Sequence, residues 1–333
     1  MRAKKDLSTL LLNWYQKHGR DLPWRVKGGA HPNPYVIFVS ELMLQQTTVK
    51  TVIPYFYRFM ERFPTVYDLA TASEEEVYQL WQGLGYYTRA RSLHTTAKMI
   101  IKDYGGKFPT TRQEILKLKG IGDYTVASFL ALAFNQPETV VDGNVMRIMA
   151  RLYHLTAPLD EIKEEIKTKA IALTSHTAPA DYASAIMDLG ATVCTPKNPQ
   201  CLLCPWQEYC LSKNSGDLEQ IPYRKKLSKK EQIGKVYLIY NKKGEILIRK
   251  RTEKGLLSGL YEFPWGDDMK VLKNAKDTGK EITHIFTHIK LTLKIYTVKS
   301  DKSPIKDGIF VAQEELDKYA LSTLMKKVYA KVA

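Results

Sequence analysis

With 333 residues, 44% of them hydrophobic, the chain can bury a sizeable core. No apolar run approaches the roughly eighteen residues that a membrane span needs, so composition excludes a membrane protein and predicts a globular one of two or three domains. A formal net charge of +15 and an isoelectric point near 9.4 favour a polyanionic partner, most commonly nucleic acid.

The first residues imitate a signal peptide, because two lysines precede an apolar stretch. Ser8 and Thr9 interrupt that stretch, and Leu11, Trp14 and Tyr15 fall on one face of a helix. We therefore expect no export signal and a cytoplasmic protein with reduced thiols.

Apolar residues then recur at helical spacing up to residue 212, and Ser73 and Thr111 open capping boxes with a glutamate three residues later. This part, 1–212, is predicted to be a helical domain. Residues 213–232 predict a basic linker; from 213 to 254 there are 13 Lys and Arg against 5 Asp and Glu. After it the period changes to two. A hairpin is expected from Val236–Tyr240 and Ile246–Arg249, within a smaller α+β domain at 233–333.

Glu41 stands alone among apolar residues in the stretch Tyr35 to Gln46 (YVIFVSELMLQQ). A carboxyl group held there loses hydration, which raises its pKa and can keep it protonated near neutral pH, as a general acid requires. The alternative is a glutamate that reaches solvent.

Gly120 and Gly122 lie between two helical patterns, in the sequence LKGIGDY. Two glycines permit a tight turn, and the helix that follows can offer free amide groups to a phosphate without reading sequence. The plainer interpretation is a turn.

Asp142 precedes the helical run Val145–Tyr153, where it is either only an N-cap or an ionised carboxylate whose pKa the helix N-terminus lowers. Glu41 and Asp142 would then be two carboxyl groups with pKa values pushed apart. Glycosidic bonds are cleaved by such pairs, through an oxocarbenium-like state.

All four cysteines of the chain fall in one window, spaced C-x6-C-x2-C-x5-C: Cys194, Cys201, Cys204 and Cys210. A disulfide framework is typical of small secreted domains, so this set predicts a metal or iron-sulfur site. Zinc and an iron-sulfur cluster both accept four thiolates, and one C-x2-C pair with longer arms favours the cluster.

Together these motifs resemble the adenine DNA glycosylases of the MutY type, within the helix-hairpin-helix glycosylase superfamily. The resemblance runs nearly end to end. It rests on Ser40–Thr47 (SELMLQQT), Gly83–Arg91 (GLGYYTRAR), Gly120–Gly122, Val141–Asn144 (VDGN) and the four-cysteine loop. It implies a mainly α helix-hairpin-helix glycosylase fold with one [4Fe-4S] cluster in the loop at 194–210, followed by a smaller α+β Nudix-like domain.

The resemblance further implies a base-excision-repair enzyme that flips adenine out of its mispair with 8-oxoguanine or guanine and hydrolyses the N-glycosidic bond. Glu41 would protonate adenine and activate water, and Asp142 would stabilise the sugar cation. Tyr124 replaces the lysine of strand-nicking relatives, which implies a monofunctional enzyme. The partner would be duplex DNA bound by a monomer, with no membrane. Further site residues carried over are Asn144, Arg20, Leu22, Trp24, Arg25, Gln46, Thr47 and Tyr86.

Residues 259–264 (GLYEFP) resemble a Nudix domain, but no catalytic Nudix box follows. The domain would therefore read 8-oxoguanine, through Phe286, Thr287 and His288. Threonine departs from the serine of the family's loop, and Ser184 stands where some members have Glu or Gln.

Three other functions are alternatives to this one. A pyrimidine-directed relative of the endonuclease III type is disfavoured by Tyr124 and by the C-terminal domain. A non-catalytic iron-sulfur DNA-binding or redox-sensing protein would leave Glu41 and Asp142 as ordinary helix residues. Nucleotide-pool hydrolysis is disfavoured by the missing Nudix box.

Overall fold

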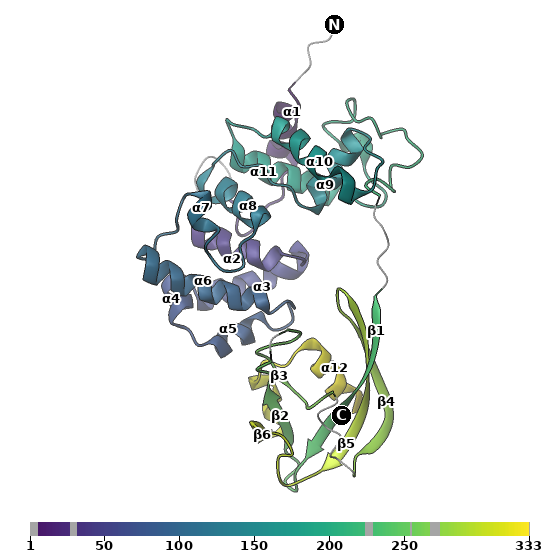
Figure 1. Ribbon diagram of the computed structural model, residues 1–333. Coiled ribbons are helices and arrows are strands. Elements are labelled where there is room, and N and C mark those ends of the chain that lie inside the picture. Colours follow the sequence, from purple (N-terminus) through teal and green to yellow (C-terminus); the bar gives the residue numbers. More distant parts are fainter. Residues whose placement is uncertain (1–5, 27–31, 224–228, 254, 267–273, 333) are drawn as a thin grey trace. The chain divides into compact units, whose positions relative to one another are not determined.

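The computed structural model describes residues 6–26, 32–223, 229–253, 255–266 and 274–332 (Figure 1). Its packing divides the chain into two compact units. The first comprises Met1–Tyr67 and Thr95–Lys226, and the second Asp68–His94 and Leu227–Ala333. The segment 68–94 therefore groups with the C-terminal unit, although it lies within the predicted helical domain. The domain limits at 212 and 233 stay a prediction.

Helices build the described part of the first unit. They are α1 (Leu7–His18), α2 (Pro34–Leu44), α3 (Val49–Arg62), α7 (Arg112–Ile115), α8 (Asp123–Phe134), α9 (Gly143–Leu152), α10 (Leu159–Leu173), α11 (Pro179–Asp188), the π-helical η1 (Leu189–Val193) and the 3-10 turn η2 (Cys201–Leu203). Two more, α4 (Val66–Thr71) and α6 (Thr88–Tyr104), cross the limits between the units. None of the helices in the described ranges has the length and apolar character of a membrane span.

The pair α2 and α8 forms the centre of the first unit. Asn33 caps α2 by accepting a hydrogen bond from the Tyr35 amide at 2.9 Å, and Pro34 occupies its first turn, where a missing amide hydrogen costs nothing. Both helices are apolar on nearly every side, as buried helices are. They pack on each other, and this brings Glu41 of α2 beside Ser128 of α8.

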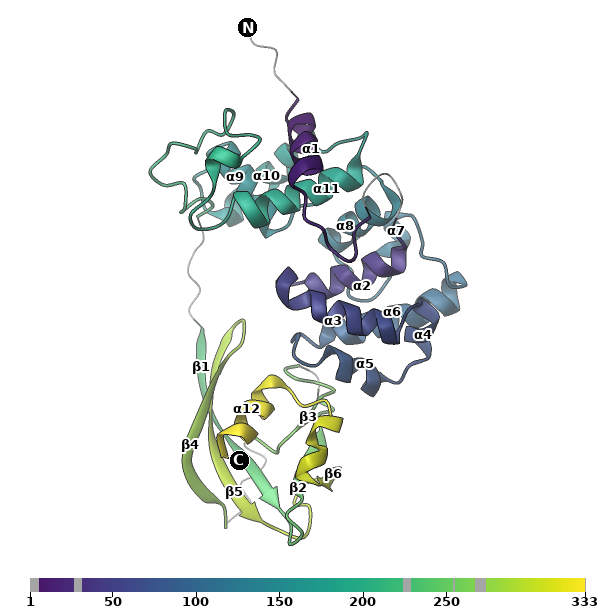
Figure 2. The ribbon, with the colours of Figure 1, turned by 180° about the vertical axis from the view of Figure 1, so that it is seen from behind.

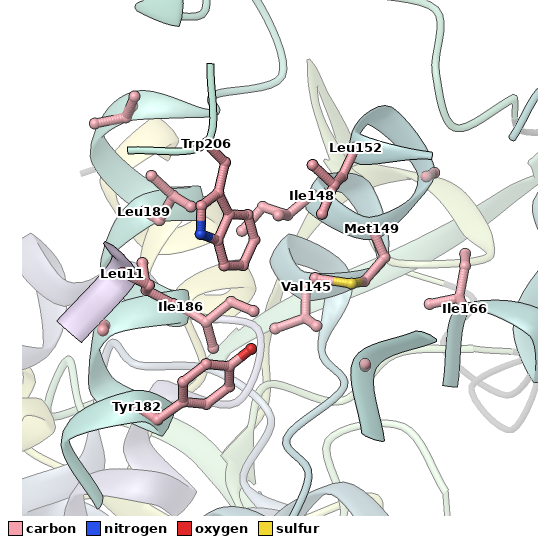
Figure 3. Packing of buried hydrophobic residues seen from close by; sticks show 14 of the residues in the cluster. Leu11, Val145, Ile148, Met149, Leu152, Ile166, Tyr182, Ile186, Leu189 and Trp206 are labelled. Carbon is pink, nitrogen blue, oxygen red and sulfur yellow. The ribbon is translucent and has the colours of Figure 1, made fainter. Parts of the chain in front are cut away.

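A second core of this unit lies where α1 packs against α11 (Figure 2) and α9 joins them. Figure 3 shows Trp206 of the cysteine loop among Ile148, Ile186 and Leu189, and its indole nitrogen donates to the Leu7 carbonyl at 2.8 Å. A residue 199 positions from its partner thus ties the loop to the first helix. The cysteine loop is therefore part of the folded core rather than an appendage.

The second unit is built on a mixed sheet, confirming the predicted α+β class. Within the described residues its order is β3-β2-β1-β5-β4, with β6 also paired to β2. The bounds are β1 (Lys230–Tyr240), β2 (Ile246–Lys250), β3 (Tyr261–Glu262), β4 (Lys276–Ile285), β5 (Ile289–Lys299) and β6 (Gly308–Val311). Helix α5 (Glu74–Trp81), the 3-10 helix η4 (Gln313–Lys318) and α12 (Thr323–Val332) complete the unit.

The predicted hairpin is confirmed, because β1 and β2 pair antiparallel with Tyr240 opposite Ile246. Two further features were not predicted. β1 begins at Lys230, so the sheet takes up the last residues of the predicted linker, and β1 pairs in parallel with β5 along its whole length. Both predicted capping boxes begin as expected, since Ser73 and Thr111 each accept a hydrogen bond from the amide three residues on.

Candidate functional site

A cavity of about 660 Å³ opens in the first unit, between α2, α8, α9 and α11. Glu41 comes from the buried face of α2, and Tyr124 from the first turn of α8. Asp142 and Asn144 come from the start of α9. Nine residues singled out from the sequence line this one cavity: Arg20, Leu22, Trp24, Arg25, Glu41, Thr47, Tyr124, Asp142 and Asn144.

Glu41 has the environment that the sequence predicts. Its side chain is 5% exposed, and Oε2 accepts a hydrogen bond from the Ser128 hydroxyl at 2.5 Å. Burial raises the pKa of Glu41 to about 7; the Ser128 hydrogen bond and the charge of Arg25 oppose the rise, and Asp142 adds to it. A carboxyl group with this pKa can both give and take a proton near neutral pH.

Asp142 caps α9, as predicted. Its Oδ1 accepts from the Val145 amide at 2.7 Å, and its Oδ2 accepts from the Asn144 side-chain amide at 2.9 Å. The predicted direction of its pKa was wrong. Burial raises the pKa of Asp142 above its usual value and outweighs these hydrogen bonds and the charge of Arg147, all of which lower it. The cap is real, but loss of hydration is the larger effect.

Tyr124 lines the same cavity as the two carboxyl groups. Burial, followed by the charges of Glu41 and Asp142, raises its pKa well above the usual tyrosine value, so the phenol stays neutral. Its hydroxyl donates to the Met187 sulfur at 3.7 Å. Tyr124 can therefore offer a neutral hydroxyl at this position but no amine nucleophile.

Trp24 is both a core residue and a lining residue of the cavity. It lines the cavity and meets Phe56 edge-on, with ring centroids 5.2 Å apart. Ser184, a departure from the family pattern, also lines the cavity. Gln46 is exposed at the end of α2, with φ of 58°, while its neighbour Gln45 is tied to the Thr125 hydroxyl at 3.0 Å. A left-handed backbone at a glutamine is costly and is typical of functional loops.

The sequence motifs do not single out Asp188, which binds two arginines of the cavity. Asp188 has no solvent exposure and receives hydrogen bonds from both Arg20 and Arg25. Its partners lie 168 and 163 positions away in the chain, so no local spacing predicts them. A lone aspartate at the end of the apolar stripe of α11 was the available signal.

The two hairpin glycines have different tasks. Gly120 has φ of 76°, a conformation that side chains rarely adopt. Gly122 is the N-cap of α8, with no side chain to satisfy the first amides of that helix, and a Cβ there would meet no atom within 4 Å. A side chain at Gly122 would therefore enter open space at the start of α8, where no side chain caps the first amides.

The four cysteines converge on one small cavity, which Arg151 and Lys213 also line. Burial and the neighbouring thiols raise the pKa of Cys204 to about 12, and one backbone hydrogen bond opposes this rise. Four thiolates at this place need a positively charged centre, and iron supplies it. The donor set suits a four-thiolate cluster, which would tie the two ends of the loop to each other.

A chain of hydrogen bonds runs from the cysteine loop to Asp142. Arg147, which is buried, donates to the Cys194 carbonyl, the Gly190 carbonyl and the Asn144 side chain, each at 2.8 Å. Asn144 donates in turn to Asp142. A Cβ on Gly190 would lie 2.6 Å from that of Asn144, so the close approach requires glycine. The loop thereby fixes a side chain of this cavity.

The second unit has a cavity of its own, of about 590 Å³. Tyr86, Phe286, Thr287 and His288, all singled out from the sequence, line it together with Lys229. Tyr86 is 47% exposed, has φ of 48°, and its hydroxyl lies 3.2 Å from that of Thr287. A strained, exposed aromatic residue beside a mostly apolar cavity suits contact with a flat ring.

Family comparisons agree with this arrangement along the chain. Residues 39–172 match the HhH-GPD superfamily base excision DNA repair proteins, residues 194–210 the iron-sulfur binding domain of endonuclease III, and residues 235–331 the NUDIX domain. The match at 194–210 confirms the expected [4Fe-4S] cluster site at the four cysteines. The predicted fold class is confirmed as well.

Individual relatives share more than the fold. The adenine DNA glycosylase of Mus musculus is 33% identical over 96% of this chain and 76% of its own length. That of Buchnera aphidicola subsp. Baizongia pistaciae is 38% identical over 76% of this chain and 72% of its own. A solved thermostable thymine-DNA glycosylase is 28% identical with a TM-score of 0.55, over 62% of this chain and 94% of that one. The chain therefore belongs to the adenine DNA glycosylases, enzymes of base excision repair in the HhH-GPD superfamily.

Proposed function

We propose that the enzyme removes adenine opposite 8-oxoguanine, or opposite guanine, by hydrolysis and without cutting the strand. The observation that carries the proposal is Glu41, whose pKa burial raises to about 7, in one cavity with Asp142. Such a pair gives one proton donor and one nearby negative charge, which breakage of a glycosidic bond requires.

In the proposed reaction adenine leaves the base stack and enters the cavity of the first unit. Glu41 gives its proton to N7 of adenine, and the electrons of the bond between the sugar and N9 move to the base. Asp142 stabilises the sugar cation that results. Water then adds to the sugar and returns its proton to the Glu41 carboxylate. Asn144 holds Asp142 in place through its hydrogen bond at 2.9 Å.

The rate of adenine release is expected to be bell-shaped in pH. Above about pH 7 it falls, because Glu41 loses the proton that it must donate. On the acid side it falls as Asp142 becomes protonated, at a pH above the usual pKa of an aspartate, since burial raises that pKa. Single-turnover rates measured across this range test both limbs, and a flat rate through pH 7 would contradict the role of Glu41.

Tyr124 supports a monofunctional enzyme, because a phenol cannot form the imine through which strand-cutting glycosylases act. Lys50 is exposed and is the lysine among the described residues that line this cavity. It is therefore the amine whose ability to form an imine with the sugar is tested. Borohydride added during the reaction traps an imine as a stable protein–DNA adduct. We expect no adduct while adenine is released; an adduct at Lys50 would show lyase chemistry.

The cavity of the second unit supports recognition of 8-oxoguanine. Replacing Thr287 by Val removes the hydroxyl and keeps the shape, so the preference for 8-oxoguanine over guanine opposite adenine is expected to fall about tenfold, the value of one hydrogen bond. Thr287→Ser keeps the hydroxyl and serves as the matched control. Competition between the two duplexes measures the preference, and equal preferences in both variants would remove Thr287 from recognition.

The free amides of α8 support binding to a DNA phosphate at Gly122. A serine there is a better N-cap than glycine, so Gly122→Ser leaves the unfolding temperature unchanged or higher. The serine side chain would occupy the space in front of the amides. Duplex affinity is therefore expected to fall about tenfold, which is about the contribution of one charge-assisted hydrogen bond. Gly216→Ser, at another glycine with open space, is the control. Unchanged affinity in Gly122→Ser would contradict the site.

A panel of duplexes tests the proposal as a whole. Each contains one adenine opposite 8-oxoguanine, guanine, cytosine or thymine, and a further duplex carries thymine opposite guanine. We expect monomeric enzyme to release adenine fastest opposite 8-oxoguanine and next opposite guanine. Release of thymine would favour the pyrimidine-directed alternative, and tight binding without any release would favour a sensor.

A further inference from the structure

Asp188 is a fully buried carboxylate that lies behind the cavity wall and binds Arg20 and Arg25, which line the cavity. Arg25 holds it through two parallel hydrogen bonds, Nη1 to Oδ2 at 2.8 Å and Nη2 to Oδ1 at 2.9 Å. Arg20 adds its backbone amide at 2.8 Å to Oδ2, and its Nε at 2.8 Å to Oδ1. A fifth donor, Arg20 Nη2, lies 2.6 Å from Oδ1. Five nitrogen atoms therefore converge on the two carboxylate oxygens of Asp188.

This arrangement differs from a surface ion pair. The Asp188 side chain is 0% exposed and that of Arg25 is 9% exposed. A bidentate pair of this burial fixes both side chains in one geometry, and either charge left alone would be strongly disfavoured. Although burial by itself raises the pKa of Asp188, the hydrogen bonds and charges of Arg25 and Arg20 together hold that pKa below its usual value. Asp188 therefore stays ionised near neutral pH.

Both arginines line the cavity that contains Glu41, and the charge of Arg25 acts on Glu41 directly. Asp142 and Tyr124 also interact with the charge of Glu41, and the Ser128 hydroxyl donates a hydrogen bond to it. The ionisable side chains that line the cavity in the described residues are Tyr15, Arg20, Arg25, Glu41, Lys50, Tyr124, Asp142 and Asp181. Arg20, Arg25 and Asp188 together contribute one net positive charge to this wall.

We infer that Asp188 is a positioning residue for adenine release, which anchors Arg20 and Arg25 on the cavity wall and sets the positive charge that Glu41 experiences. The inference rests on the proposed acid role of Glu41. With Asp188 in place, the wall carries one net positive charge instead of two, which limits how far the arginines favour the ionised form of Glu41. A second uncompensated cation would also oppose the positive charge that develops on the sugar.

Three charge states of the wall can be made by two substitutions. Arg25→Gln leaves a net charge of zero, the native protein has one positive charge, and Asp188→Asn has two. The double variant with both changes returns to one positive charge. Because a positive neighbour favours the ionised form of a carboxyl group, the pH at which adenine release fails should fall along this series.

The test is the single-turnover rate of adenine release, with cluster-containing full-length enzyme in excess over a duplex bearing one adenine opposite guanine, from about pH 5 to about pH 9. Relative to the native enzyme, Asp188→Asn is expected to move the alkaline limb down by about one pH unit, making release about tenfold slower at high pH and near normal at low pH. Arg25→Gln is expected to move the limb up. The double variant and Asp188→Glu should restore it.

Asp160→Asn makes the same charge change at an exposed acid that pairs with Lys163 at 2.7 Å, and its profile should match the native one. Two results would overturn the inference and leave Asp188 a structural residue. Either Asp188→Asn slows adenine release equally at every pH, or the pH of the alkaline limb does not fall from Arg25→Gln through the native enzyme to Asp188→Asn. If Asp188→Asn does not fold, Arg25→Gln decides alone, because its limb must rise. A native enzyme with no alkaline limb near pH 7 would instead count against the proposed role of Glu41.

Discussion

Glu41→Gln is expected to slow adenine release by about a hundred to ten-thousand-fold, the usual contribution of a general acid. Glutamine has nearly the same shape and can still accept the hydrogen bond from Ser128, but it has no proton to give at any pH. Duplex affinity should stay within about threefold of native, because no charge is lost from the protonated form. Single-turnover release and equilibrium binding, measured on the same preparation, separate the two effects.

The same variant makes a prediction about stability with a definite sign. Burial raises the pKa of Glu41 from 4.5 to about 7, so its contribution to stability is complete below about pH 4.5 and is lost as pH rises through about 7. At about pH 8 the native protein must keep a buried charge that glutamine avoids, and Glu41→Gln should be more stable by up to about 3 kcal/mol. Glu165→Gln on the exposed side of α10 is the control. A less stable Glu41→Gln protein at this pH would contradict the burial argument.

Arg147→Met is expected to reduce both stability and adenine release. Methionine fills much of the volume but leaves the Cys194 carbonyl, the Gly190 carbonyl and Asn144 without their donor, at a cost of at least about 3 kcal/mol. Asn144 is then no longer held, and the misplacement of Asp142 that follows should slow release by about tenfold to a hundredfold. Thermal unfolding and single-turnover release of cluster-containing protein measure the two losses.

Arg151→Met distinguishes this relay from simple loss of the loop. Arg151 lies one turn further along α9, is more deeply buried than Arg147, and donates to the carbonyls of Thr195, Pro196 and Ile221. Among the described residues, these hydrogen bonds lead to the loop and to Ile221, and not to Asn144. We expect Arg151→Met to lose stability and cluster but to keep a near-native rate per cluster-containing molecule. Equal rates for the two variants would mean that the loop affects the catalytic cavity only through folding.

Much of the site follows from local pattern. Glu41 was predictable because its neighbours along the chain are apolar, and the cysteines because ligand spacing is itself a sequence property. The cap at Asp142 was predictable for the same reason. The direction of its pKa was not, since the effect that outweighs the cap is burial by residues distant in the chain. Sequence shows a helix start, whereas hydration depends on the assembled fold.

Features made by long-range pairing were out of reach. Asp188 meets its arginines across more than 160 positions, and β1 pairs in parallel with β5 from residues 230–240 to 289–299. The grouping of residues 68–94 with the C-terminal unit is likewise a property of packing. Periodicity identifies which face of an element is buried, but not which partner covers it.

The most direct test of the account is the fate of one adenine opposite 8-oxoguanine in a duplex treated with the cluster-containing enzyme. Free adenine is quantified, and the strand is examined before and after alkali, which cleaves at abasic sites. We predict one adenine released per duplex, an intact strand before alkali and a cut strand after it. Intact adenine in a tightly bound duplex, or a strand cut before alkali, would contradict the account.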